Sequence, residues 1–302
     1  MKLSDLQIRD PFVLPLPARG EYLLYGTTDR NAWSGPGTGF DAYRSRDLQH
    51  WEGPIPAFRP PAGFWATTQF WAPEVHAYGG RYYMFATFKA PGRSRGTQVL
   101  VADDPAGPFE PLTDGPVTPD GWECLDATLW VEDGAPWMVY CHEWVQVGDG
   151  RMVAQRLSAD LRHAEGEPLV LFQGSDGPWA RPLPNVNLAE VPGAEGLKPG
   201  TPLYITDGPF LHRTASGALL MLWSSVGEQG YAMGLARSRT GKITGPWEHD
   251  AQPLFAAQGG HGMIFQTLAG QLMLTLHQPN KTPHERARFF VLREEGDALV
   301  LG

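Results

Sequence analysis

The chain has 302 residues, 42% of them hydrophobic, so it can bury a core and is not a disordered chain. Its 33 acidic and 24 basic residues give a net charge of −9, which repels phosphate backbones and anionic lipids, and we expect neither nucleic acid nor a membrane as a partner. No apolar run approaches the roughly 18 residues of a membrane span, and no secretion signal is recognisable. A cytoplasmic location is therefore expected, with Cys124 and Cys141 as buried free thiols.

Five strand-like segments of similar pattern recur about every 50 to 60 residues, with one longer step. Each follows a short apolar segment and precedes a segment of alternating character, as EYLLYGTT precedes FDAYRSRD. Several repeats add a short aromatic piece after a further turn. The five segments begin at Glu21, Arg81, Pro136, Ala218 and Gln271.

Four antiparallel strands per repeat are typical of propeller blades, in which each sheet covers its neighbours. Glycine and proline together make up about a fifth of the chain, against a usual share of about 12%, which favours many tight turns. We therefore predict an all-β protein, a single five-bladed β-propeller over residues 1–302. A pair of β-sandwiches also fits short strands with regular turns, but it has no reason to restart the same order five times.

The long step contains a loop-rich insertion, about residues 174–200, between the third and fourth repeats. Long loops of this kind are usually either a functional rim or a disordered excursion. Trp179 favours the functional rim.

The innermost strand of each blade lines the central channel, so residues that open these strands should meet near the axis. Taken singly, Asp10 before a proline and Asp207 before a glycine are ordinary turn residues. Taken together, in matching places of different blades, carboxyl groups that shift each other's pKa values predict a functional site. The five opening residues are Asp10, Glu74, Asp126, Asp207 and His261.

Polar residues at the ends of the second strands should surround the same site, because an antiparallel partner returns to the rim from which the first strand leaves. His142 and Glu143, directly after a buried-looking strand, are the strongest of these candidates. Trp71 offers a flat apolar face for a sugar ring, although a core position is commoner for a tryptophan. The second strands end with Thr28, Lys89, His142, Glu143, Ser225 and His277.

Carboxyl groups and aromatic walls around an open pocket suit glycoside hydrolysis, in which one carboxylate deprotonates water and one carboxylic acid protonates the leaving oxygen. A third acid can hold up the pKa of the proton donor. The sequence has no phosphate-binding glycine loop, no paired CxxC, no HExxH and no GxSxG that would support a rival chemistry.

Over essentially its whole length the chain resembles glycoside hydrolase family 43, the five-bladed propeller glycosidases of the arabinosidase and xylosidase type. The resemblance implies an inverting mechanism in which Asp10 is the general base and Asp126 tunes the pKa of the acid and orients it. The residues that carry the resemblance are Arg9-Asp10-Pro11-Phe12, Trp71-Ala72-Pro73-Glu74, Leu125-Asp126-Ala127 and Gly260-His261-Gly262.

The chain departs from the family at the general acid. Members typically open blade four with a glutamate before Gly-Pro, whereas this chain has Asp207 before Gly208-Pro209, which is shorter by one methylene. A misplacement of about an ångström can cost two orders of magnitude in rate. Either Asp207 in a rebuilt pocket or Glu143 donates the proton, or catalysis is lost.

The resemblance also suggests further site residues. No cofactor is required, but in some members a histidine at this place helps to hold a calcium ion through water, so His261 is a candidate ligand of a structural calcium ion in the central channel. Its alternative role is that of a satisfied core histidine. Arg286 is a candidate for hydrogen bonds to sugar hydroxyls, or a solvated loop arginine. The candidate substrate-binding residues are Trp71, Glu74, His142, His277 and Arg286.

The expected activity is that of an inverting exo-glycosidase that removes terminal arabinofuranose, xylose or galactofuranose from short oligosaccharides. Two alternatives remain open. One is a non-catalytic carbohydrate-binding propeller that has lost its general acid, and the other is a fructan-active propeller enzyme, which would retain the anomeric configuration.

Overall fold

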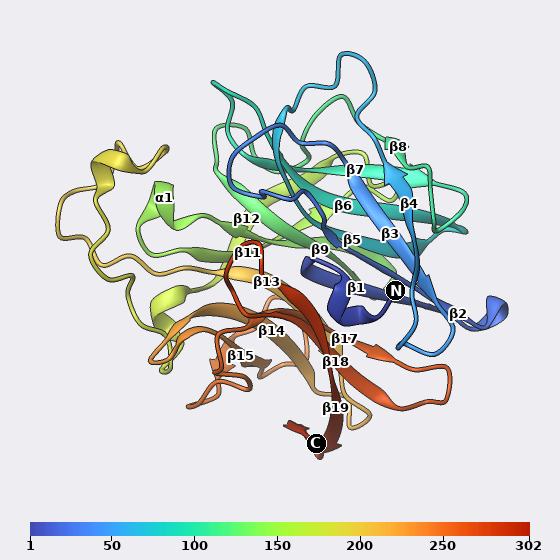
Figure 1. The fold of residues 1–302 in the computed structure, drawn as a ribbon. Coiled ribbons are helices and arrows are strands. Elements are labelled where there is room, and N and C mark those ends of the chain that lie inside the picture. Colours follow the sequence, from blue (N-terminus) through green and yellow to red (C-terminus); the bar gives the residue numbers. More distant parts are fainter.

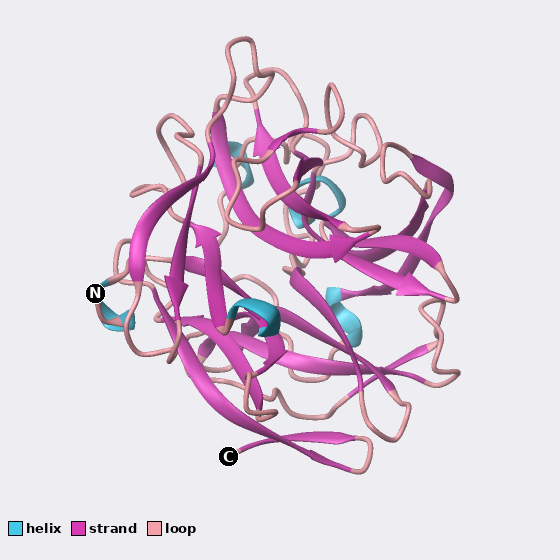
Figure 2. Ribbon diagram, turned by 90° about the vertical axis from the view of Figure 1, so that its right-hand side faces the viewer, coloured by secondary structure: helices cyan, strands magenta, loops and turns pink.

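The computed structural model describes residues 1–302 and contains five four-stranded antiparallel sheets arranged around a common centre (Figure 1). The predicted five-bladed β-propeller is therefore confirmed. Strands dominate the molecule, and helical turns are few and short (Figure 2). None of the helices is both long enough and apolar enough to cross a bilayer.

Every blade is one continuous segment of the chain, and its strands follow one another outward from the centre. The helical pieces are η1 (Leu3–Asp5), η2 (Pro17–Arg19), α1 (Trp144–Val147), η3 (Gly174–Asp176) and η4 (Leu188–Glu190). From the innermost strand outward, the strands are β1 (Arg9–Leu16), β2 (Glu21–Thr27), β3 (Phe40–Ser45) and β4 (Glu52–Phe58) in blade 1; β5 (Thr68–Tyr78), β6 (Arg81–Lys89), β7 (Gly96–Ala102) and β8 (Glu110–Pro111) in blade 2; β9 (Cys124–Glu132), β10 (Ala135–His142), β11 (Arg151–Leu157) and β12 (Ala164–Gln173) in blade 3; β13 (Asp207–Arg213), β14 (Leu219–Gly227), β15 (Gly230–Ser238) and β16 (Trp247–His249) in blade 4; β17 (Gly260–Gln266), β18 (Leu272–Gln278), β19 (Arg286–Glu295) and β20 (Ala298–Leu301) in blade 5.

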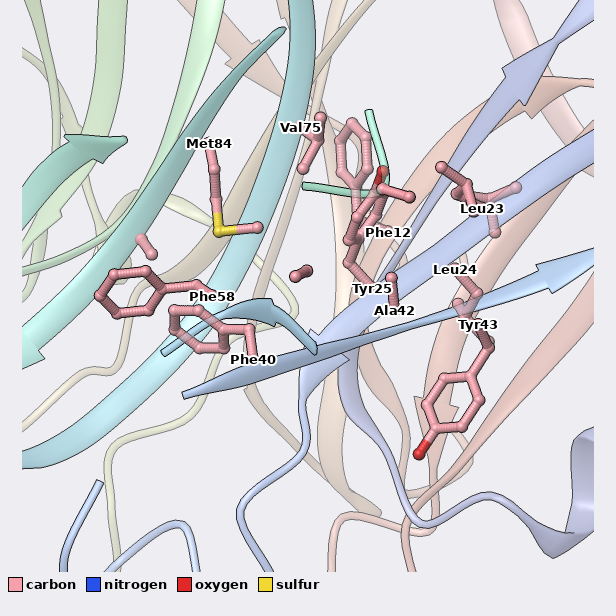
Figure 3. Packing of buried hydrophobic residues seen from close by; sticks show 14 of the residues in the cluster. Phe12, Leu23, Leu24, Tyr25, Phe40, Ala42, Tyr43, Phe58, Val75 and Met84 are labelled. Atoms are coloured by element: carbon pink, nitrogen blue, oxygen red, sulfur yellow. The ribbon is translucent and has the colours of Figure 1, made fainter. Parts of the chain in front are cut away.

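The hydrophobic core lies between the facing sheets of neighbouring blades. The second strands are buried on both faces, and in β2 all residues from Glu21 to Thr27 are buried. Apolar side chains of blades 1 and 2 interdigitate in the largest cluster, where Phe40, Phe58 and Met84 meet (Figure 3). Both Cys124 and Cys141 are buried free thiols, as expected. The blades therefore hold one another in place by burial of apolar surface.

Each innermost strand carries a bulge near the same rim. Its register against the second strand shifts there, and one residue adopts the left-handed conformation. Left-handed backbone is uncommon for residues other than glycine, so its presence in all five blades marks a structural repeat. The left-handed residues are Asp10 (φ 51°), Ala72 (φ 47°), Asp126 (φ 58°), Gly208 (φ 51°) and His261 (φ 49°).

These bulges define which residues are equivalent, and they correct the sequence-based alignment of the blades. Asp207 lies one residue before the left-handed Gly208, whereas Asp10 and Asp126 are themselves left-handed. Glu74 lies two residues after Ala72, so the true counterpart of Asp10 in blade 2 is an alanine. The expected set of matching openings is therefore wrong at Asp207 and Glu74, because the pairing with the second strand, which the hydrophobic pattern does not reveal, decides which residues are equivalent.

A ring of hydrogen bonds connects the blades at this rim. In four of the five junctions, the backbone N–H of the left-handed residue donates to a side chain on the second strand of the preceding blade. The four bonds are Ala72 to Thr27 Oγ1 (2.8 Å), Asp126 to Thr87 Oγ1 (2.9 Å), His261 to Ser224 Oγ (2.8 Å) and Asp10 to His277 Nδ1 (3.3 Å).

The junction between blades 3 and 4 differs from the others. The acceptor position on the second strand is occupied by Cys141, which pairs with Leu125 as Thr27 pairs with Arg9. The N–H of Gly208 donates instead to Oδ2 of Asp126, at 3.1 Å.

The insertion at 174–200 packs against blade 4 through its first part, and its later part lies beside α1, where Gly193 comes close to Val145 (Figure 1, yellow). Trp179 is buried against Trp223, with ring centroids 4.7 Å apart. It also lies over Gly234, where a β-carbon would come within 2.4 Å of the indole ring. Glycine is therefore needed at 234 for the tryptophan to dock.

The first and last blades meet without sharing a strand. Contact between β1 and β17 closes the ring, and residues 1–8 pack along blade 5. The Ile8 N–H donates to the Glu285 carbonyl, and Arg286 Nε donates to the Ser4 carbonyl at 2.9 Å.

Candidate active site

A cavity of about 290 Å³ opens at the rim that carries the bulges. All five blades contribute to its wall, together with loops after β2, β10 and β12. It includes six of the predicted site residues, namely Asp10, Asp126, Asp207, Glu143, Trp71 and His261. The other lining residues are Arg9, Ala32, Trp33, Leu125, Trp144, Leu183, Ile205 and Tyr231.

Asp10 is buried and held in its ionised form. Thr27 donates its hydroxyl to Asp10 Oδ2 at 2.7 Å, and Oδ1 lies 3.2 Å from Nδ1 of His261. Burial raises the pKa of Asp10, but the charges of His261 and Arg9 outweigh that effect and lower the pKa to about 2. A carboxylate that stays charged in this setting can accept a proton.

Asp126 and His261 form a second contact across the channel. Oδ2 of Asp126 lies 3.5 Å from Nδ1 of His261 and accepts the N–H of Gly208. Burial raises the pKa of Asp126 to about 7, and the neighbouring aspartates add to the rise. Burial lowers the pKa of His261, but the charges of Asp10 and Asp126 outweigh it and raise that pKa. A charged imidazole between two aspartates therefore fits the site.

Asp207 differs from Asp10 in having no cationic side chain within ion-pair distance, since His261 is paired with Asp10 and Asp126. Burial raises the pKa of Asp207 and outweighs the opposing charge of His261, so this carboxyl group holds a proton more readily than an ordinary aspartate does. Tyr231 donates its hydroxyl to Asp207 Oδ2 at 3.0 Å, which leaves Oδ1 to carry the proton. Asp207 can thus donate a proton where Asp10 can accept one.

Glu143 lines the cavity but is engaged elsewhere. Its carboxylate forms an ion pair with the guanidinium of Arg95, and both side chains are about nine-tenths buried. Arg95 also contacts Glu123, which binds Lys89 at 2.7 Å. Protonation of Glu143 would remove the negative charge that this ion pair places beside the buried Arg95. This environment opposes a role as proton donor.

Trp71 reaches the cavity, although its faces are partly occupied. The guanidinium of Arg95 lies 4.6 Å from its ring centroid, and Trp33 meets it edge to face at 5.3 Å. Trp33 is 53% exposed and comes from the loop after β2. Arg9 stacks on Trp33 at 4.8 Å and binds the buried Glu285 at 2.8 Å. Trp33 therefore offers more free aromatic surface to a ligand than Trp71 does.

Four predicted substrate-binding residues lie outside the cavity wall. Glu74 is buried lower in the channel, 3.1 Å from His76. His142 stacks on Trp122 with ring centroids 4.0 Å apart, and its Nε2 is 2.7 Å from Gln146 Oε1.

His277 is fully buried behind Asp10, and burial lowers its pKa to about 3, so the ring is neutral and accepts the Asp10 N–H. Arg286 donates to the main-chain carbonyls of Ser4, Pro283 and Glu285.

The expected calcium ion, which His261 would hold through water, stays a prediction. Calcium takes six to eight oxygen ligands. Nδ1 of His261 faces Asp10 and Asp126, and no group of three or more histidine, cysteine, aspartate or glutamate side chains has a geometry suited to a metal ion. No step below involves a metal.

Arg9, Trp33 and Tyr231 line the cavity, although the sequence did not mark them as site residues. Arg9 stands beside Asp10 in the quoted motif, which was a usable signal. Trp33 lies in a loop rich in glycine and polar residues, where a large aromatic side chain has no core to fill. Tyr231 is the second residue of β15, and nothing in the sequence indicated that it would face Asp207.

A propeller with paired carboxyl groups of opposite proton affinity at the mouth of its channel has the features of a glycoside hydrolase. The family model "Glycosyl hydrolases family 43" matches residues 4–294, so the chain belongs to this family of enzymes that act on O-glycosyl bonds. A comparison with curated proteins finds no match.

Solved structures agree with this assignment. An endo-arabinase from Bacteroides thetaiotaomicron VPI-5482 is 37% identical, with a TM-score of 0.86 over 98% of this chain and 97% of that one. A thermostable family-43 glycoside hydrolase is 22% identical, with a TM-score of 0.78 over 98% and 92%. An endo-1,4-beta-xylanase from the same Bacteroides strain is 20% identical, with a TM-score of 0.74 over 98% and 94%. The last two support the fold alone.

Proposed function

We propose that the enzyme is an inverting, exo-acting glycosidase that removes a terminal pentose or furanosyl residue from short oligosaccharides, with α-L-arabinofuranosides as its first substrate class. The observation that carries the proposal is the contrast between Asp10, whose pKa is lowered to about 2, and Asp207, whose pKa is raised, at one small cavity.

Asp10 acts as the general base. It is ionised at neutral pH and accepts the proton of the attacking water, while the hydroxyl of Thr27 and the ring of His261 hold its two oxygens. Asp207 acts as the general acid and protonates the leaving oxygen. Inversion needs these two carboxyl groups roughly 6.5–9.5 Å apart, with the water between base and sugar.

Asp126 supports both groups without touching the leaving oxygen. It binds the N–H of Gly208, the residue next to Asp207, and it shares His261 with Asp10. Asp126 therefore orients the acid through the backbone of Gly208. Its shared contact with His261 couples the acid side of the site electrostatically to the base, Asp10.

Asp207 is favoured over Glu143 as the acid by their partners. Asp207 contacts a neutral hydroxyl, whereas Glu143 contacts a buried guanidinium that would lose one of its two carboxylate partners if Glu143 took up a proton.

The size of the cavity favours exo action on short substrates. Its volume of about 290 Å³ is at the small end of the roughly 300–1,000 Å³ that ligand pockets span, which suits one or two sugar units. Leu183 of the insertion and Trp33 of the loop after β2 wall the cavity on different sides. The preference for arabinan-type substrates rests on the 37% identical endo-arabinase, and the proposed exo mode differs from the endo activity of that relative.

The proposal is tested with α-1,5-arabino-oligosaccharides, xylo-oligosaccharides and the nitrophenyl glycosides of the three candidate sugars. We expect monosaccharide as the only early product, in the inverted configuration by NMR. Early release of longer fragments contradicts the exo mode, a retained anomer contradicts the mechanism, and binding without turnover of any substrate identifies a non-catalytic propeller.

The catalytic roles are tested by substitution. Asp10→Asn should lower kcat by about three orders of magnitude on every substrate. Asp207→Asn should lose comparable activity on oligosaccharides but little on dinitrophenyl glycosides, whose leaving group needs no proton. The exposed Asp103→Asn is the control and should match the wild type. If Glu143→Gln shows the leaving-group dependence and Asp207→Asn does not, Glu143 is the acid.

A further inference from the structure

We propose that Cys141 is a positioning residue for the general acid: because it offers no strong acceptor in the ring of hydrogen bonds between blades, the N–H of Gly208 is left to bind Asp126. The inference rests on the proposed role of Asp207, the residue directly before Gly208.

The other four junctions show which hydrogen bond a stronger acceptor at position 141 would form. The second-strand residues Thr27, Thr87, Ser224 and His277 each accept the N–H of the left-handed residue in the next blade, at 2.8 to 3.3 Å. Cys141 holds the corresponding register position, opposite Leu125 in the same blade. Only at this junction does a carboxylate of the cavity replace the second-strand side chain.

A thiol is suited to leaving this N–H free. Sulfur is a weak acceptor, whereas hydroxyl oxygens and neutral imidazole nitrogens are strong ones. Cys141 is fully buried, and burial raises its pKa far above the ordinary value, so it stays a neutral thiol. It therefore fills the space of a serine without competing for the proton of Gly208.

The backbone at Gly208 is closely confined, so an acceptor introduced at position 141 would have to reach its N–H where it now lies. Its φ is 51°, and a β-carbon there would come within 2.7 Å of the His261 ring. His261 packs against one side of Gly208, and Asp126 accepts its N–H on the other. These contacts also fix the direction in which the side chain of Asp207 points.

The test replaces Cys141 by serine, which has nearly the same size and the acceptor that Ser224 provides one blade further on. In Cys141→Ser the N–H of Gly208 should turn to the introduced hydroxyl, so Asp126 loses a hydrogen bond that favours its charged form. We expect kcat on arabino-oligosaccharides to fall roughly tenfold while KM stays within about twofold. The basic limb of the pH profile, which Asp207 sets, should move downward, because a more readily protonated Asp126 repels the Asp207 carboxylate less and so lowers the pKa of Asp207.

Cys141→Ala is the matched variant, because alanine also lacks an acceptor. It should lose stability but keep the pH profile of the wild type. An unshifted profile in Cys141→Ser overturns the proposal, and an equal shift in both variants overturns it too, because the effect is then one of packing.

A readout without substrate separates this inference from the proposed function. Titration of the Asp126 carboxyl by ¹³C NMR should give a higher pKa in Cys141→Ser than in the wild type or Cys141→Ala. If that pKa rises but no variant, nor the wild type, hydrolyses any glycoside, the hydrogen-bond switch is correct and the proposed function is wrong. If the wild type is active and the pKa is unchanged, the reverse holds.

Discussion

Two aspartates at one cavity differ in proton affinity because of the groups beside them. Asp10 accepts a hydroxyl hydrogen bond and lies beside His261 and Arg9, which together overcome the cost of burial. Asp207 is equally buried but meets the hydroxyl of Tyr231 as its closest partner, so the cost of burial dominates and its pKa rises.

Tyr231→Phe tests this account. The tyrosine hydrogen bond lowers the pKa of Asp207, so its loss should raise that pKa further and keep the acid protonated to higher pH. The basic limb of the pH profile of kcat/KM should move to higher pH. The rate at the pH optimum should fall about fivefold, because the hydrogen bond that positions Asp207 is lost.

The matched control for that experiment is Tyr25→Phe. Tyr25 is fully buried and donates to the Pro105 carbonyl far from the cavity. It should lose about 1 kcal/mol of stability with an unchanged pH profile. A basic limb that stays in place in Tyr231→Phe would contradict the assignment of Asp207 as the group that titrates.

The sequence predicted single site residues where ordinary structural roles did not account for the whole set. Three aspartates and a histidine in recurring places pointed to a site, and all four line the cavity. Glu74 was placed by the same reasoning and Arg286 by its place in a loop expected to return toward the site, but both lie elsewhere, because a local pattern does not say which way a side chain points. Tyr231 acts through one contact with a residue 24 positions away, which no local signal records.

At the scale of elements, the pattern of strands was readable but their alignment was not. Alternating and aromatic segments located all five blades, because burial on both faces imposes a composition that recurs. That composition does not record which residue of an innermost strand pairs with which residue of the second strand. The offset of Asp207 and Glu74 could therefore be seen only in the pairing of β13 with β14 and of β5 with β6.

The insertion at 174–200 should act on substrate affinity through the docking of Trp179. Trp179→Phe should lower the free energy of unfolding by about 1 to 3 kcal/mol and raise KM several-fold, because Leu183, four residues further on, lines the cavity. Denaturant unfolding and steady-state kinetics measure the two effects.

Trp51→Phe is the control for the insertion. Trp51 is also buried, and it packs on Phe289 away from the cavity. It should cost similar stability with no change in KM. Equal effects of both substitutions on KM would mean that general loosening, and not the insertion, controls affinity.

At the scale of the molecule, the ring closes by packing between its first and last blades, and Arg286 contributes to that closure. Arg286→Ala should lower Tm by about 2 °C, since hydrogen bonds to three carbonyls are lost, and should leave KM unchanged. Arg288→Ala, an exposed neighbour on the same strand, should change neither. A rise in KM in Arg286→Ala alone would return Arg286 to the substrate-binding residues.

Because every blade is a continuous stretch of chain, the order of synthesis from the ribosome is also the order of the blades. The proposed base comes from the first blade and the proposed acid from the fourth, while His261 and His277, which flank the base, arrive with the last. A nascent chain can therefore form most of its sheets before it has any glycosidase activity. Activity recovery during refolding should then lag behind the return of strand content, because the final blade completes the catalytic centre.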